Sequence, residues 1–455
     1  MAGEQLARVS LVPPRIEPPA RPLNRLSFIA RFVRNPLAVV PQAAYEEDIV
    51  FLPGAPIAWV TGPAMVKTIL LEEREKFLKL AQIRLLEPLL GKGILTSEGA
   101  HWKWQRQAAA PMFRLQELTG FVPGFVRAAR ALLAQWRAQP AAERAIDRDM
   151  TQVTFDVISA TLLPSADARM PGAVEAATGR FQRSGAWGQL YAVANLPKWL
   201  PQPGRAGAAA AVRALREAAL AAVRERRGTA APKDDLLTRL MRAHDPESGQ
   251  QMNDEQLVDN LLTFYLAGHE TTANALTWTL YLIARSPEWA QALEAEIARV
   301  AGGADITAAH LEQLVLTTQV IKEAMRLYPP VPIMTRQAVV DAQLEGHAIK
   351  AGTSLVMPIY AIHRHARRWG QPDAFDPARF APGREEKIAR YQYLPFGAGP
   401  RICIGMAFAM LEATAILATL LQHARFAATA HEPVPVARVT LIPKGGMPLQ
   451  VSFRR

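Results

Sequence analysis

A loop that carries the single cysteine of the chain constrains the fold more than any other feature. Residues 396–405 read Phe-Gly-Ala-Gly-Pro-Arg-Ile-Cys-Ile-Gly, and Cys403 is the only cysteine among 455 residues. The glycines and the proline predict a tight, irregular loop, and the apolar run from Met406 predicts a buried helix. A cysteine just before a helix lies near backbone N–H groups that favour the thiolate. The alternative for a lone cysteine is a buried, inert thiol.

These ten residues resemble the haem-ligand signature of the cytochrome P450 family, Phe-x-x-Gly-x-Arg-x-Cys-x-Gly. Every fixed position is filled, by Phe396, Gly399, Arg401, Cys403 and Gly405. The resemblance implies that the cofactor is haem b and that Cys403 is the axial thiolate ligand of its iron. It also implies that Arg401 pairs with a haem propionate and that Phe396 packs beside the sulfur.

Length and composition indicate how the chain is divided. Half of the residues are apolar, and no Ser/Gly linker, internal repeat or charge block marks a domain boundary. The resemblance implies the cytochrome P450 fold, which is mainly α with a small β-rich subdomain. We therefore expect residues 40–455 to form a single haem domain. Residues 1–39 are expected to form a proline-rich N-terminal strap that runs extended over the surface.

Charge and cysteine content bear on partners and location. The excess of 52 basic over 41 acidic residues gives a net charge of +11. Such a charge fits an acidic partner protein, nucleic acid, an anionic membrane surface, or an arginine-rich composition spread over the surface. No signal peptide and no N-terminal apolar run near the ~20 residues of a membrane helix is present. We predict a soluble, cytoplasmic monomer without a membrane span or a nucleic-acid partner.

A tryptophan and an arginine at helical spacing provide a second candidate haem contact. Trp102 and Arg106 are spaced i,i+4 and share a helix face. A surface cation–π pair is the alternative interpretation. The pattern Trp-x-x-x-Arg, followed by Pro-x-Phe, resembles the P450 helix whose Trp and Arg hydrogen-bond a haem propionate. The resemblance therefore makes both residues candidate propionate partners.

The segments before that helix predict a hairpin and a loop. Residues 49–60 flank Pro53-Gly54 and predict a β-hairpin. Residues 78–97 contain one proline and two glycines, which predict a loop with short helical pieces. In the family the corresponding loop caps the substrate pocket, which places Leu95 over the haem.

A buried helix is predicted from residue 254 to residue 285, with an unusual polar sequence at its centre. Ala267-Gly268-His269-Glu270-Thr271-Thr272 interrupts an otherwise apolar pattern that includes Phe264. A benign kink in a long helix is one interpretation, since Gly costs about 1 kcal/mol relative to Ala and Thr can bond back to a carbonyl. In P450s this motif crosses the distal face of the haem. The resemblance implies that Thr271 hydrogen-bonds bound O₂, that Glu270 relays protons, and that Phe264, Ala267 and Gly268 border the substrate.

Three charged residues match the scaffold of the cysteine loop in the family. Glu323 and Arg326 lie i,i+3 on a predicted helix that ends at Pro329-Pro330. Elsewhere such a pair is a surface ion pair of little energetic value. The resemblance implies that the pair is buried and that Arg379, in the Pro-x-Arg-Phe segment, completes a triad with it.

The remaining site predictions fall in the C-terminal third of the chain. After the double proline, Val331 and Ile333 are predicted to line the pocket, and Arg336 is a further propionate candidate. Strand-like residues follow at 352–359, and a hairpin near residues 439–447 is expected to place Val439 at the far end of the pocket.

The resemblance implies a haem-thiolate monooxygenase that inserts one oxygen atom from O₂ into an apolar small molecule by hydroxylation or epoxidation. Electrons would come from a separate acidic ferredoxin or flavodoxin and its NAD(P)H reductase, docked on basic residues that include Lys103 and Arg114. The motifs look closest to the soluble, bacterial-type fatty-acid-hydroxylating and microsomal-like branch of the family. However, residues 50–60 contain no Arg, Lys or Tyr to hold a fatty-acid carboxylate, so a terpenoid, polyketide or other apolar substrate is equally open. The alternatives are a peroxide-dependent peroxygenase or isomerase and a non-catalytic haem sensor.

Overall fold

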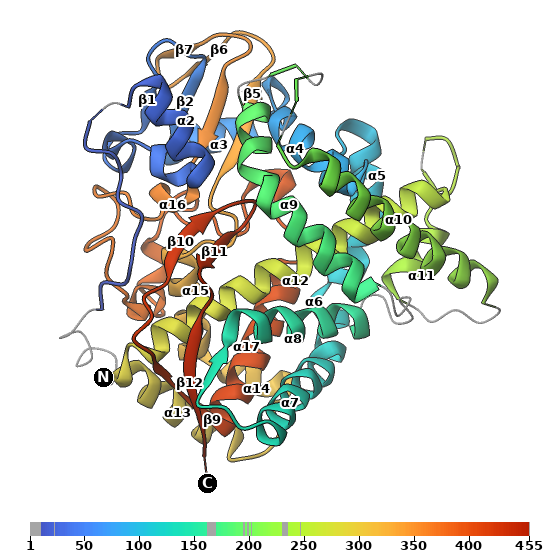
Figure 1. Cartoon of the computed structure of the whole chain (residues 1–455), viewed down its shortest axis with the longest axis vertical. Helices are drawn as coiled ribbons and strands as arrows, with labels where there is room; N and C mark the ends of the chain where they lie inside the picture. The colour runs from blue at the N-terminus through green and yellow to red at the C-terminus, as the bar shows by residue number, and fades with distance from the viewer. Residues whose placement is uncertain are drawn as a thin grey trace.

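The polar-centred helix predicted around Gly268 is the axis of the molecule. This helix, α12 (Asp254–Ala284), has 31 residues and begins at Asn253, whose side chain forms a reciprocal capping box with Gln256. Its own apolar side chains point outward on all faces, so the helix is buried along most of its length. It packs against α8 (Ile146–Thr161) and α17 (Met406–His423), and in Figure 1 it crosses the middle of the molecule.

The computed structural model describes residues 11–21, 23–161, 170–193, 196–197, 200–201, 203–229, 235–245 and 247–454. The other long helices are α2 (Arg25–Arg34), α4 (Leu80–Leu90), α5 (Gly99–Ala109), α7 (Val122–Ala138), α9 (Met170–Val193), α10 (Arg205–Gly228), α13 (Pro287–Ala301) and α15 (Val315–Leu327). Shorter helices are α3 (Pro63–Lys67), α6 (Leu115–Leu118), α11 (Leu236–Arg242), α14 (Ala308–Gln313) and α16 (Ile359–Ile362).

Strands form a small part of the fold. The main sheet has the order β1-β2-β8-β5-β3, with strands Ile49–Phe51, Ile57–Val60, Ser354–Met357, Met334–Ala338 and Phe77–Leu78. A second sheet has the order β4-β12-β9, with strands Glu143–Ala145, Pro448–Phe453 and Ala424–Ala428. Two hairpins pair β6 (Ala342–Leu344) with β7 (His347–Ile349) and β10 (Val434–Ala437) with β11 (Leu441–Lys444). Figure 1 shows the main sheet at one corner, strands β9 to β12 (red) running through the centre and lower part of the view, and helices over much of the rest.

Several local predictions are confirmed and three are wrong. The 49–60 hairpin forms, since β1 and β2 pair antiparallel. Residues 80–90 form one continuous helix with Pro88 inside it, not a loop, because its apolar face packs on α9 and α12. The C-terminal hairpin is shifted to residues 434–444, with Val439 in its turn. The strap is extended only in its described residues 11–21, since residues 25–34 form α2, capped by Asn24.

The core is built from the whole length of the described chain. One cluster of buried side chains includes residues from Ile16 to Leu449, and a smaller one lies under the main sheet. Among the described helices, α17 alone is long and apolar enough to cross a membrane, and 61% of its apolar stretch is buried inside the protein. Its apolar character therefore serves packing against α7, α12 and α13.

Candidate active site

The cysteine loop contains a 3₁₀ turn (Gly399–Arg401) and ends at the start of α17. The Cys403 backbone N–H donates to the Phe396 carbonyl oxygen (3.0 Å), which closes the loop on itself. The side chain of Cys403 is exposed, yet the surrounding protein is dense enough that burial raises the pKa of its thiol. The thiol therefore faces a space inside the molecule and not the outer surface. The Gly405 N–H bond lowers this pKa, as predicted, but burial outweighs it.

Close packing explains one of the glycines in this loop. Gly399 has a φ of +71°, and an added Cβ would lie 2.2 Å from the Leu70 carbonyl oxygen. Only glycine fits this backbone and this contact. On the other side, the Arg106 Nη1 donates to the Ile402 carbonyl oxygen (2.9 Å). The loop is thus held from α5 and from the segment after α3.

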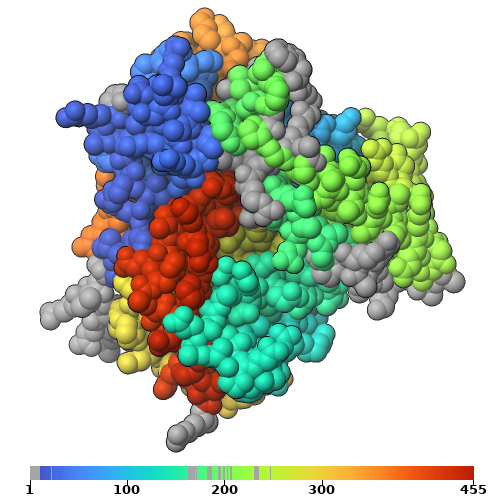
Figure 2. Space-filling view, viewed as in Figure 1, coloured from blue at the N-terminus to red at the C-terminus, as the bar shows by residue number. Residues whose placement is uncertain are grey.

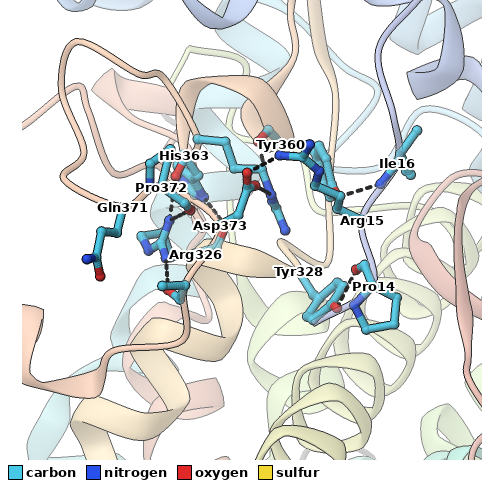
Figure 3. A network of polar contacts seen from close by, with 12 residues as sticks. Pro14, Arg15, Ile16, Arg326, Tyr328, Tyr360, His363, Gln371, Pro372 and Asp373 are labelled. Atoms are coloured by element: carbon cyan, nitrogen blue, oxygen red, sulfur yellow. Dashed lines mark hydrogen bonds and ion pairs between the residues drawn. The ribbon is translucent and has the colours of Figure 1, made fainter. Parts of the chain in front are cut away.

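The predicted triad is present and buried beneath the same region. Arg326 Nε and Nη2 donate to the Glu323 carboxylate at 2.7 and 2.8 Å, and both side chains are 0% exposed. The Arg379 Nε lies 3.4 Å from Glu323 Oε1. Arg326 also donates to the carbonyl oxygens of His363 (2.8 Å) and Pro372 (2.7 Å), as Figure 3 shows. One guanidinium therefore fixes the segment from His363 to Ala374 at several points.

The N-terminal strap is joined to this network. The Tyr328 hydroxyl donates to the Pro14 carbonyl oxygen (2.6 Å), and the Ile16 N–H donates to the Tyr360 hydroxyl (3.0 Å). Arg15 forms an ion pair with Asp373, the residue next to Pro372. Figure 3 shows the strap lying along the residues that surround Arg326. The strap thus supports the scaffold of the site from outside.

A group of cationic side chains gathers between α4, α5, β5 and the cysteine loop. Arg401 lies 3.9 Å above the Trp102 ring, donates to the Ser97 carbonyl oxygen (2.9 Å) and forms an ion pair with Glu98. Arg336 is 7% exposed and donates to the Thr335 carbonyl oxygen (2.8 Å). Burial lowers the pKa of Arg336 to about 10.

Lys79 belongs to the same cationic group. Its Nζ donates to the Leu95 carbonyl oxygen (3.1 Å), and the side chain is 7% exposed. Burial, followed by repulsion from Arg336 and Arg401, lowers its pKa to about 7. Buried like charges with one carboxylate among them favour an anionic ligand, and the two propionates of haem supply that charge. With the thiol of Cys403 in the same interior, the donor set fits haem.

The polar centre of α12 contacts the C-terminal hairpin. The Thr271 hydroxyl donates back to the Ala267 carbonyl oxygen (2.8 Å), the bond expected of a threonine inside a helix. The Glu270 carboxyl group accepts a hydrogen bond from the Thr440 hydroxyl in the turn between β10 and β11. Both polar residues of the predicted acid–alcohol pair are half-buried.

A cavity of about 880 Å³ adjoins these residues. Of the predicted pocket residues, Leu95, Ala267, Val331, Ile333 and Val439 line it, together with Glu270 and Thr271. Two others do not. Gly268 faces α8, where an added Cβ would lie 2.8 Å from the Ile158 Cδ1. Phe264 is 7% exposed and stacks on Phe113 at a ring distance of 5.7 Å.

These two positions correct the sequence prediction. The glycine in α12 is needed for the close approach of α8, and it does not line the cavity. Phe264 points to the side of α12 where Phe113 lies, near Gly405. Helical periodicity indicated that both were buried but could not indicate which neighbour buries them.

The structure also adds site residues that the sequence did not indicate. Lys79, Glu98 and Thr440 stand in no recognisable motif. For Thr440, the only indication in the sequence was its neighbour Val439, which was predicted to line the pocket. Each acquires its role from a contact with a residue far away in the chain.

A helical fold with a thiol in a glycine-bordered loop, a buried cationic group and an apolar cavity defines a haem-thiolate protein. The family model for cytochrome P450 matches residues 49–448. The chain therefore belongs to the cytochrome P450 family, whose cofactor is haem b bound through a cysteine thiolate, and it is a P450 monooxygenase.

Relatives come from plants and bacteria. The chain is 30% identical to 11-oxo-beta-amyrin 30-oxidase of Glycyrrhiza uralensis over 416 residues, which cover 87% of this chain and 78% of that protein. It is 30% identical to cyclooctat-9-en-7-ol 5-monooxygenase of Streptomyces melanosporofaciens over 82% of this chain and 80% of that protein. The crystal structure of the cytochrome P450DA heme domain matches with a TM-score of 0.82 and 26% identity, covering 98% of this chain and 99% of that chain.

Proposed function

We propose that this P450 inserts one oxygen atom from O₂ into an apolar organic substrate by hydroxylation or epoxidation. The observation that carries the proposal is the position of Glu270 and Thr271 on the wall of the large cavity. The rest of that wall is almost entirely apolar, which suits a substrate without many polar groups. When bound, haem supplies the oxidising chemistry, and the protein supplies ligation, proton delivery and placement.

We assign the proton relay to Glu270 and Thr271. The Thr271 hydroxyl would be able to donate its proton into the cavity in place of the Ala267 carbonyl oxygen, because a hydroxyl rotates freely between acceptors. Glu270 can pass a proton to it from the Thr440 side of the cavity. Trp102, Arg106, Arg336 and Arg401 are proposed to hold the propionates, with Lys79 beside them, and Phe396 to shield the sulfur.

Electrons are proposed to come from a separate acidic ferredoxin or flavodoxin and its NAD(P)H reductase. Lys103 and Arg114 are exposed and lie on either side of the segment that supports Cys403. Arg106 is hydrogen-bonded to the cysteine loop, and Arg401 is paired with Glu98. Lys103 and Arg114 therefore remain for docking. An acidic surface would be attracted to these charges at low ionic strength.

We also propose that the chain works as a soluble, cytoplasmic monomer with a single haem domain from residue 40 onward. The continuous core from Ile16 to Leu449 supports one domain. The contacts of Pro14, Arg15 and Ile16 support the role of the preceding strap as a brace.

Two measurements test the proposed function. The reduced, CO-bound spectrum should show the Soret shift of a thiolate ligand, and Cys403→Ser should abolish that shift. Turnover with NADPH and ferredoxin partners should exceed peroxide-driven turnover. The reverse ratio would favour a peroxygenase, and no turnover in either case would favour a haem sensor.

A further inference from the structure

The short turn between β10 and β11 carries two side chains that line the large cavity, Val439 and Thr440. A hydrogen bond from the Arg438 N–H to the Thr440 carbonyl oxygen (2.9 Å) closes this turn. The Thr440 hydroxyl donates to the carboxyl group of Glu270, the proposed relay acid on α12. A group that fixes the backbone of Arg438 therefore also fixes the hydroxyl that Glu270 faces.

Gln189 of α9 holds this turn from another wall of the cavity. Its side-chain amide donates a hydrogen bond to the Arg438 carbonyl oxygen, and the two residues are 249 positions apart in the chain. Gln189 is half-buried and lines the same cavity as Glu270 and Thr440. The contact therefore joins a cavity-lining residue of α9 to the turn that faces the acid.

The end of α2 holds the same turn and the strand that leads into it. The Arg438 Nη1 donates to the Arg34 carbonyl oxygen (2.7 Å). The Asn35 side chain donates to the Pro435 carbonyl oxygen and accepts from the Ala437 N–H (3.1 Å each). Figure 2 shows the C-terminal segment (red) meeting the N-terminal segment (blue), below the segment that includes α9 (green). Since α2 also packs on α9, both helices bear on the first residue of the turn.

The other end of the turn is fixed to the core independently. The Leu441 N–H donates to the Pro330 carbonyl oxygen (3.0 Å), and the Trp278 Nε1 donates to the Leu441 carbonyl oxygen (3.1 Å). Thr440 lies between this fixed end and Arg438. The direction of its hydroxyl therefore depends on what holds the Arg438 carbonyl group.

We infer that Gln189 is a positioning residue for the proposed proton relay, because it holds the turn that directs the Thr440 hydroxyl at Glu270. Without the amide of Gln189, the Arg438 carbonyl oxygen would lose its partner beside an apolar cavity, which is unfavourable, and the turn would rotate to find another donor. The inference rests on the proposed function, since the relay is the activity that Gln189 serves. It makes the geometry of the acid depend on α9, a helix that is remote from it in the chain.

The test uses carbon monoxide as the probe, bound to the reduced holoprotein, because the C–O stretching band responds to polar groups close to the gas. Gln189→Met is the test variant, since methionine has a similar length and no N–H to donate. Thr440→Val and Glu270→Gln are references that remove each member of the pair. Thr178→Val is the control, because Thr178 lines the cavity from α9 and its hydroxyl bonds to no residue that the structure describes.

Gln189→Met should move the band in the direction of Thr440→Val, by at least about half of that shift, and should add nothing in the double variant with Thr440→Val. A positioning residue has no effect once the group that it positions is gone. Gln189→Glu, whose ionised side chain only accepts hydrogen bonds, should act like Gln189→Met. Thr178→Val should leave the native band. Mass spectrometry should also show about 5- to 10-fold faster amide exchange in residues 434–444 of Gln189→Met.

A native band in both Gln189 variants would overturn the inference. An equal shift in Thr178→Val, or additive shifts in the double variant, would overturn it too, since each would assign the effect to the contents of the cavity. A band that Glu270→Gln leaves unchanged would contradict the proposed relay and the inference with it. The Soret band of every CO complex is recorded: a native protein without the thiolate shift would contradict the proposed function, whereas a normal shift with an unmoved C–O band in the Gln189 variants contradicts only the role of Gln189.

Discussion

The carboxyl group of Glu270 accepts a hydrogen bond from the hydroxyl of Thr440, 170 positions further along the chain. Both residues line the large cavity, and Thr440 is 4% exposed. The turn that carries Thr440 is anchored, since the Leu441 N–H donates to the Pro330 carbonyl oxygen and the Trp278 Nε1 donates to the Leu441 carbonyl oxygen. The orientation of the acid in the proposed relay is therefore set by the C-terminal hairpin.

Thr440→Val should release Glu270 from this orientation while keeping the shape of the side chain. We expect the fraction of electrons recovered in product to fall by about 3- to 10-fold, with a matching rise in hydrogen peroxide, because proton delivery becomes less effective. Product and peroxide per NADPH are measured. Thr440→Ser keeps the hydroxyl and should couple as well as the native protein; equal coupling in the valine variant would contradict this role.

Glu323→Gln should destabilise the protein through its buried ion pairs. The Glu323 carboxylate accepts hydrogen bonds from Arg326 and from the Asp376 N–H (2.9 Å). It also lies 3.4 Å from the Arg379 Nε. Removing one charge from a buried pair costs about 3–5 kcal/mol in the free energy of unfolding. Urea unfolding and haem retention measure the effect.

Glu385→Gln is the control for that substitution. Its partner is Lys322, and the side chains are 40% and 26% exposed, so the expected cost is below about 1 kcal/mol. Similar costs for both variants would show that burial of the triad adds nothing.

Lys79 should make the stability of the haem-free protein depend on pH. Its pKa in the folded state is lowered from 10.5 to about 7, so between these values the unfolded chain binds more protons than the folded one. The free energy of unfolding should therefore rise with pH, by about 3 kcal/mol between pH 7 and pH 9.5.

Urea unfolding at the two pH values measures this rise. Lys79→Met should remove most of it, because methionine does not titrate. Bound haem should also make the rise of the unfolding free energy with pH smaller, since the propionates stabilise the protonated lysine. A rise that persists unchanged in Lys79→Met would assign the dependence to another group.

Lys103→Glu together with Arg114→Glu should slow reduction by an acidic partner. We expect about a tenfold lower rate at low salt and a flatter dependence on ionic strength, because the attraction that guides docking is lost. Stopped-flow reduction of the CO complex measures the rate. The double variant Arg31→Glu/Arg34→Glu changes the net charge by the same amount, but on α2, away from these two residues. It should be reduced at nearly the native rate.

Sequence alone identified the parts of the site that depend on local spacing. The loop that carries Cys403, the helix centred on Glu270 and Thr271, and the pair Glu323 and Arg326 each match a short motif of the cytochrome P450 family, and the resemblance supplied their expected roles. Their chemistry is expressed within a few residues, so one segment contains the signal. The same reasoning predicted the β1–β2 hairpin and the helix that begins at Met406.

Tertiary packing decided the rest. Gly268 meets Ile158 instead of the cavity, Lys79 joins Arg336 and Arg401, and Thr440 reaches Glu270. These contacts join elements that are far apart in the chain, and short-range patterns do not record which elements pack together. Residue types at the site could be predicted from the sequence because local geometry restricts them. Which of them share a cavity depended on how the helices cross.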